Sequence, residues 1–223
     1  MRATDRTTGW RVWAGAVVML AGMSPHAGAD DVVPPEWRGD GLYTFQEWEF
    51  MTPGAIPPDG EIPTFNPNGV PLMTPGSGVA WDPNFQTFGL DGYVGNAGGG
   101  SLLFAVPNYI DLEPEKFIRV QINGVWGVTP PSVASIAAVD NVEPNPVIQF
   151  LASDERFPGF HRWEDWLILP NPDSETIQID VPSGAFVNQV IIETTSIPEP
   201  SGFVLLLGAG LMLARGTYTR HRT

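Results

Sequence analysis

The sequence predicts an all-β protein, an antiparallel β-sandwich or jelly roll, with an N-terminal signal helix and a C-terminal transmembrane helix added at its ends. Two segments, 117–122 and 177–181, alternate apolar and polar residues as half-buried strands require. Proline and glycine clusters separate many other short apolar runs, and few helical candidates remain between them. Short strands joined by turns favour an antiparallel fold over a repeating strand–helix fold.

The remaining strands are predicted from short runs of apolar and β-branched residues. They are expected at 42–50, 101–106, 132–139, 147–152, 163–169 and 187–195. The pair Asn123-Gly124 predicts a two-residue hairpin turn that leads into a strand at 125–128, because such turns need positive φ at both positions. The proline-dense segment 51–75 is expected to be a long loop broken by short edge strands, and 95–100 a flexible connector.

A secretory signal peptide is expected over residues 1–29. Arginines precede an apolar run at 12–23, and Ala27 and Ala29 supply the small side chains of a cleavage site. The mature protein would then begin at Asp30. An uncleaved signal anchor is the alternative, but it needs a longer apolar segment than this one.

The C-terminal end combines three features in a fixed order. Pro198, Glu199 and Pro200 are followed by an apolar stretch at 202–214, and the chain then ends in basic residues that include Arg215, Arg220 and Arg222. As a helix the apolar stretch reaches roughly 20 Å, against about 30 Å of hydrocarbon, so it spans a bilayer only marginally. Basic residues after the span predict a cytoplasmic C-terminus.

This tail resembles the PEP-CTERM sorting signal of Gram-negative bacteria, which exosortases, membrane enzymes similar to transpeptidases, recognise. The resemblance implies an exported protein that is anchored in the inner membrane, processed by an exosortase-type enzyme and delivered to the cell surface or extracellular matrix. A plain membrane anchor with a chance Pro-Glu-Pro is the alternative. The chain thus divides into a signal peptide (1–29), a β-sandwich ectodomain (30–196) and a sorting tail (197–223).

The ectodomain is strongly acidic and contains no cysteine. Nucleic acid is excluded as a partner because its phosphates would be repelled by the many carboxylates. Few cations oppose these, and in residues 30–196 they are Arg38, Lys116, Arg119, Arg156 and Arg162. Thiol nucleophiles and thiolate metal sites are excluded as well, while about 165 residues can bury a core without disulfides.

Metal and hydrolase chemistry finds little support in the residue pattern. His161 is the only histidine of the ectodomain, which argues against histidine-rich zinc sites, and no Gly-x-Ser-x-Gly elbow accompanies it. We therefore expect no catalytic residue and no cofactor. Carboxylates could still bind calcium, with weak candidates at Asp82, Asn84, Asp91 and Asp154.

Two alternatives to an inert surface domain remain open. A glycoside hydrolase needs one carboxylate on each side of the glycosidic bond, and Glu47 with Glu49, or Glu164 with Asp165, would be candidates.

A carbohydrate-binding module would instead bind extracellular polysaccharide through exposed aromatic rings. Trp163 and Trp166 are the candidates for glycan contact, although residues three apart on a strand lie on opposite faces.

Overall fold

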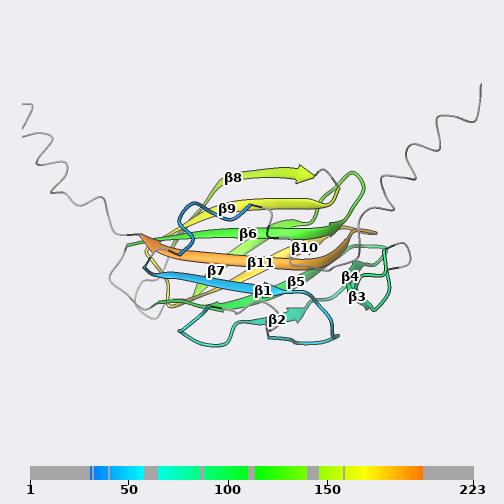
Figure 1. The fold of residues 1–223 in the computed structure, drawn as a ribbon, viewed down its shortest axis with the longest axis horizontal. Coiled ribbons are helices and arrows are strands. Elements are labelled where there is room, and N and C mark those ends of the chain that lie inside the picture. Colours follow the sequence, from blue (N-terminus) through cyan, green and yellow to red (C-terminus); the bar gives the residue numbers. More distant parts are fainter. Residues whose placement is uncertain are drawn as a thin grey trace, which may run out of the picture. The chain divides into compact units, whose positions relative to one another are not determined.

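Figure 1 shows the fold as a computed structural model, which describes residues 31, 33–39, 41–57, 65–85, 88–109, 114–139, 146–157 and 159–197. Within these ranges every regular element is a β-strand, as the sequence predicts. No helix in the described ranges is long and apolar enough to cross a bilayer. The signal segment, the sorting motif and the apolar span of the tail lie outside the described residues.

The described residues form eleven strands. In chain order they are β1 (Tyr43–Trp48), β2 (Leu72–Pro75), β3 (Val79–Asp82), β4 (Gly92–Gly95), β5 (Gly100–Pro107), β6 (Glu115–Val125), β7 (Ser132–Val139), β8 (Val147–Phe157), β9 (His161–Leu169), β10 (Ser174–Val181) and β11 (Phe186–Ile197).

These strands make two antiparallel sheets. The first has seven strands in the order β3-β4-β11-β6-β9-β8, and β1 joins β11 along the same edge as β4. The second has four strands in the order β2-β5-β10-β7. Strand β11 is the centre of the larger sheet, since β6 pairs with it from Phe186 to Ile197 on its other edge.

The core lies between the two sheets, which gives the domain a sandwich-like form. Trp48 of the first sheet meets Phe104 of the second edge to face, with ring centroids 4.8 Å apart, and both side chains are completely buried. Alternate residues of the long strands fill the layer around them, for example Val190 and Ile192 in β11. Each such aliphatic side chain stabilises the fold by about 1.5–3 kcal/mol through its removal from water.

Most strand predictions are confirmed, with errors at the ends. The runs predicted at 42–50, 101–106, 132–139 and 187–195 correspond to β1, β5, β7 and β11. The strand expected at 147–152 continues to Phe157. The sequence does not predict strands β3 and β4. Each has only four residues, which is too short to show an alternation of apolar and polar side chains.

The predicted hairpin at Asn123-Gly124 is wrong. Both residues lie inside β6, where Asn123 pairs with Gln189 on one side and His161 on the other. A Cβ on Gly124 would lie 1.9 Å from the carbonyl oxygen of Phe186, so glycine is required here by the close approach of β11. Glycine serves tight turns and close backbone contacts alike, and the dipeptide alone does not distinguish them.

Candidate functional site

The outer face of the first sheet, which points away from the second sheet, is lined with polar side chains in register. Glu193 of β11 stands beside Arg119 of β6, which stands beside Asp165 of β9. Residues opposite one another on neighbouring strands share a face, so these three side chains form one row across the sheet.

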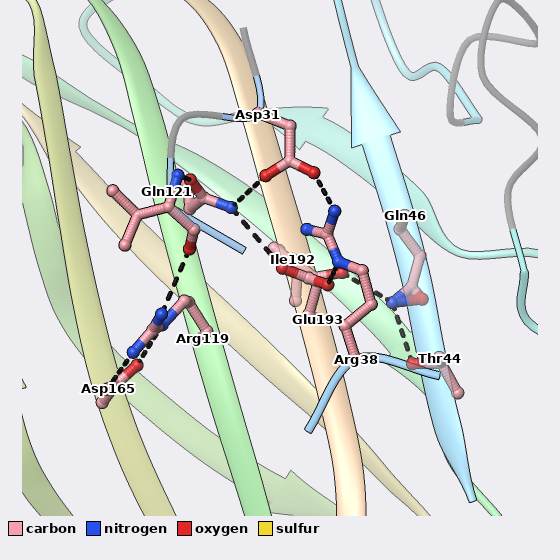
Figure 2. Close-up of polar contacts among 10 residues, drawn as sticks. Asp31, Arg38, Thr44, Gln46, Arg119, Gln121, Asp165, Ile192 and Glu193 are labelled. Atoms are coloured by element: carbon pink, nitrogen blue, oxygen red, sulfur yellow. Dashed lines mark hydrogen bonds and ion pairs between the residues drawn. The ribbon is translucent and has the colours of Figure 1, made fainter. Parts of the chain in front are cut away.

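A segment that we call the N-terminal strap, residues 31 and 33–39, packs onto this outer face (Figure 2). Arg38 donates hydrogen bonds to Asp31 and to Glu193, and its guanidinium lies 5.1 Å from the ring centroid of Phe45. The side-chain amide of Gln121 binds the strap through both its nitrogen and its oxygen. Its Nε2 donates to Asp31 over 2.8 Å, and its Oε1 accepts from the backbone N–H of Val33 over 3.0 Å.

Arg119 joins the strap to the sheet. Its Nη1 donates to the carbonyl oxygen of Val33 over 3.1 Å, while Nε and Nη2 bind the two oxygens of Asp165 at 2.7 and 2.6 Å. This two-pronged geometry is the strongest form of an arginine–carboxylate contact. Arg119 also lies 4.6 Å from the ring centroid of Trp163, so one face of that indole is occupied by a cation.

The central carboxylate of the row, Glu193, depends on Arg38 for its charge. Burial raises the pKa of Glu193, and the hydrogen bond and charge of Arg38 oppose that rise only in part. Burial by itself would lower the pKa of Arg38, but its contacts with Glu193 and Asp31 outweigh this and raise it. The guanidinium is therefore the permanently charged member of the cluster.

A second buried row runs beside the first. Gln189 donates to Glu47, and Asn123 donates to Gln189, so β1, β11 and β6 are linked side chain to side chain. His161 Nε2 lies 3.3 Å from Oε1 of Gln121. All these side chains are less than a tenth exposed, so the row is shielded from water although it lies on the outer face of the sheet.

The carboxylates considered for glycoside hydrolysis lie in β1, directly after it, and in β9. Glu47 is 1% exposed and accepts from Gln189, whereas Glu49 follows the end of β1. Glu164 and Asp165 are consecutive residues of β9 and therefore point to opposite faces. Glu164 binds Arg162 at 2.8 Å on its own strand.

The two tryptophans behave as their spacing predicts. Trp163 stands opposite Gln121 on the outer face, while Trp166 packs against the core and meets Phe150 edge to face at 5.2 Å. They lie on opposite faces of β9 and do not form one stacking platform.

The carboxylates considered for calcium serve local turns where the structure records their contacts. Asp82 accepts from the backbone N–H of Asn84 over 2.9 Å, and Asp154 accepts from that of Glu155 over 2.8 Å. Across the described ranges no three histidine, cysteine or acidic side chains are grouped so as to hold a metal ion.

An open polar groove lies at the end of the second sheet. Its volume is about 540 Å³, and glycines at 78 and 98–100 are among the residues that line it. Gln178 Nε2 donates to Asp180 over 2.9 Å within it. The groove offers hydroxyl, amide and carboxylate groups from Ser77, Ser101, Thr129, Ser132, Gln178 and Asp180.

Several predicted functional residues lie outside the described part of the chain: the cleavage positions Ala27 and Ala29, the motif Pro198-Glu199-Pro200 and the basic residues of the tail. The role of Arg38 does not follow from any sequence motif, and the rarity of cations in this acidic domain is the one signal of it. In comparisons with known proteins, no protein-family model, no curated protein and no solved structure matches this chain.

Proposed function

We propose that this chain is an exported protein that its C-terminal tail holds in the inner membrane until an exosortase-type enzyme processes it. Its acidic domain then acts at the cell surface or in the extracellular matrix of a Gram-negative bacterium, without catalysing a reaction. One observation carries the proposal: β11, the central strand of the domain, ends at Ile197, and the Pro-Glu-Pro motif begins at the next residue. A sorting enzyme would therefore find its motif directly after the last described strand of the domain.

The contacts on the outer face support a non-catalytic role. Glu193, Asp165 and Glu47 are each bound by side chains from another strand or from the strap. Buried carboxylates that are held in such rows stabilise one arrangement of strands, whereas a general acid or base needs access to substrate.

The ends of the native protein test the proposal. We expect mass spectrometry of the protein from cell envelope and medium to find an N-terminus at Asp30 and a new C-terminus close to Pro200. The variant Glu199→Ala should accumulate uncleaved in the membrane fraction, as should the wild-type chain in a strain without the exosortase.

The matched control is Glu143→Ala, which also removes a glutamate that precedes a proline, and it should be processed normally. An intact, unprocessed chain in the cytosol would overturn the proposal. Identical processing of the Glu199→Ala and wild-type chains would show that the Pro-Glu-Pro motif is not read.

Binding of extracellular polysaccharide is a second candidate function, and the polar groove favours it. Sugar hydroxyls pair well with amide and carboxylate groups such as those of Gln178 and Asp180. Affinity electrophoresis of the full chain through a panel of soluble polysaccharides tests it. Asp180→Ala should remove any retardation, and Trp163→Ala, on the other sheet, should leave it unchanged. Retardation that depends on Trp163 instead would place the site on the outer face of the first sheet.

A further inference from the structure

The chain contains a single lysine, Lys116, and that side chain is completely buried. All other cationic residues of the sequence are arginine or histidine. Lysine differs from arginine in one chemical respect that matters inside a protein: its amine can lose a proton and then act as a nucleophile.

Lys116 alternates with the core residues of β6, so its side chain faces the space between the two sheets, and its charge acts on the buried acid Glu175. It belongs to β6 of the first sheet, and Glu175 belongs to β10 of the second. Asn108 follows directly after β5, the neighbour of β10. Glu175 and Asn108 are 1% and 2% exposed, so water is largely excluded from all three side chains.

The contacts orient the carboxamide of Asn108 against the acid. Its Nδ2 donates to Oε2 of Glu175 and, over 3.2 Å, to the carbonyl oxygen of Pro172. Within the described part of the chain, neither Oδ1 of Asn108 nor Oε1 of Glu175 has a hydrogen-bond partner. Buried oxygens without hydrogen-bond partners lower the stability of a folded protein.

The amine of Lys116 acts on the same acid. Its Nζ lies 3.5 Å from Oγ of Ser196, and its charge acts on Glu175. The three groups, a nucleophile, a carbonyl carbon and a proton carrier, are all buried, and Glu175 interacts with both of the others.

We propose that Lys116 and Asn108 become joined by an intramolecular isopeptide bond. The neutral amine of Lys116 attacks Cγ of Asn108, a bond forms between Nζ and Cγ, and the bond from Cγ to Nδ2 breaks. The proton lost by Nζ goes to the leaving nitrogen, which departs as ammonia. No oxidant, reductant or further reactant is needed, and the inference is independent of the proposed sorting function.

Glu175 is placed to carry the proton. Burial raises its pKa, and although the charge of Lys116 and the hydrogen bond from Asn108 oppose this rise, the resulting pKa is about 7. An acid with a pKa near neutrality can take a proton from the lysine ammonium, which leaves the amine neutral, and can then protonate the leaving group. A neutral pair is also favoured over two buried charges in this apolar setting.

An exported domain without cysteine has a use for such a bond. It cannot form disulfides, the usual covalent reinforcement of exported proteins. The alternative is that Lys116 and Glu175 remain an ordinary buried ion pair, and the two arrangements differ in mass and in amine chemistry.

The wild-type protein is sufficient for the first test. With its ends fixed by peptide mapping, the intact mass should be lower than the sequence mass by one ammonia molecule. Cleavage before Asp111 and after Glu115 separates residues 108 and 116, so the two peptides should stay joined after that digestion. A mass equal to the sequence mass, with the two peptides released separately, would overturn the proposal.

The single lysine allows a second test. After denaturation, an amine-reactive reagent should label no ε-amine in the wild-type chain, because the only one is consumed. In Asn108→Ala the same reagent should label one ε-amine per chain, even if that variant folds poorly. Full labelling of the wild-type ε-amine would contradict the proposal.

Two further variants assign the roles. Glu175→Gln should slow or abolish the loss of ammonia, whereas Asn171→Ala, a carboxamide whose Nδ2 donates to Ser196 over 3.2 Å, should leave it complete. Loss of the cross-link in Asn171→Ala, with a joined peptide that contains residue 171, would show that Asn108 is the wrong carboxamide.

Discussion

Arg38 and Glu193 lie 155 residues apart in the sequence and form an ion pair on the outer face of the first sheet. Glu193 is completely buried, while about a quarter of the Arg38 side chain reaches solvent. The pair ties the beginning of the described domain to its last and central strand. The row beyond it extends through Arg119 to Asp165, so the strap is connected to three strands at once.

Removal of Arg38 should destabilise the domain and release the strap. In Arg38→Ala the buried carboxylate of Glu193 loses its cation, at an expected cost of about 2 kcal/mol, below that of a fully buried pair because Arg38 is partly exposed. Urea unfolding measures the loss, and limited proteolysis should cut the variant first between residues 31 and 41. Glu36→Ala, an exposed change in the same strap, should alter stability by less than about 0.5 kcal/mol. Equal proteolysis of both variants and the wild type would contradict the role of the pair.

The stability of the domain should increase as the pH falls from 8 to 5. The pKa of Glu175 is raised from 4.5 to about 7 in the folded state, so folding favours its protonated form. Its contribution is fully present below pH 4.5 and is lost as the pH rises through 7, a difference on the order of 3 kcal/mol.

Urea unfolding at several pH values measures this slope, and Glu175→Gln should reduce it. Glu193 retains a smaller slope of the same sign, because its pKa is also raised. Lys116 and Asn108 are the groups that oppose the shift of Glu175. Conversion of Lys116 to a neutral amide removes one of them and would steepen the slope further. A profile that is flat from pH 8 to 5 would contradict the raised pKa.

Two glycines near the end of β6 should differ strongly in how much stability the same substitution costs. Gly124→Ala would push a Cβ to within 1.9 Å of a backbone carbonyl of β11, and we expect a loss of about 2–3 kcal/mol. Gly127→Ala meets nothing within 4 Å and should change stability by less than about 0.5 kcal/mol. Thermal unfolding of the two variants makes the comparison, and equal midpoints would show that β6 and β11 can separate at Gly124 without cost.

The two tryptophans of β9 should differ in their contribution to folding. Trp166→Ala removes a ring that packs on the core and on Phe150, at an expected cost of about 3 kcal/mol. Trp163→Ala loses mainly its contact with Arg119, which we expect to cost about 1 kcal/mol. Denaturant midpoints measure both, and a larger loss for Trp163→Ala would reverse the assignment of the two faces.

The sequence predicted the strands better than the side-chain networks. Alternating patterns such as that of residues 117–122 identified strands because burial on one face leaves a period of two. The same patterns cannot show which strands become neighbours, so the row from Glu193 through Arg119 to Asp165 could not be foreseen. Gln121 lies on the polar side of a strand that the sequence predicts to be half-buried, and Asn123 is predicted in a turn, whereas the strap and the second row bury both.

The spacing rule for strands did succeed at one candidate site. It placed Trp163 and Trp166 on opposite faces before any contact was known. The cluster of Asn108, Lys116 and Glu175 was invisible for a different reason: its members come from separate strands of two sheets. The presence of one lysine in 223 residues was the only signal of it in the sequence.

The central position of β11 also determines how the domain meets mechanical load. Residue 198 follows Ile197 directly, so tension applied through the C-terminus enters along the axis of a strand that β6 borders throughout and β1 and β4 border in turn. The hydrogen bonds on both edges of β11 would then be loaded in shear, so that many of them must break together. In a strand peeled from the edge of a sheet, the hydrogen bonds break one after another. A domain that is held through a central strand would therefore withstand a larger pulling force than one held through a strand at the edge of the sheet.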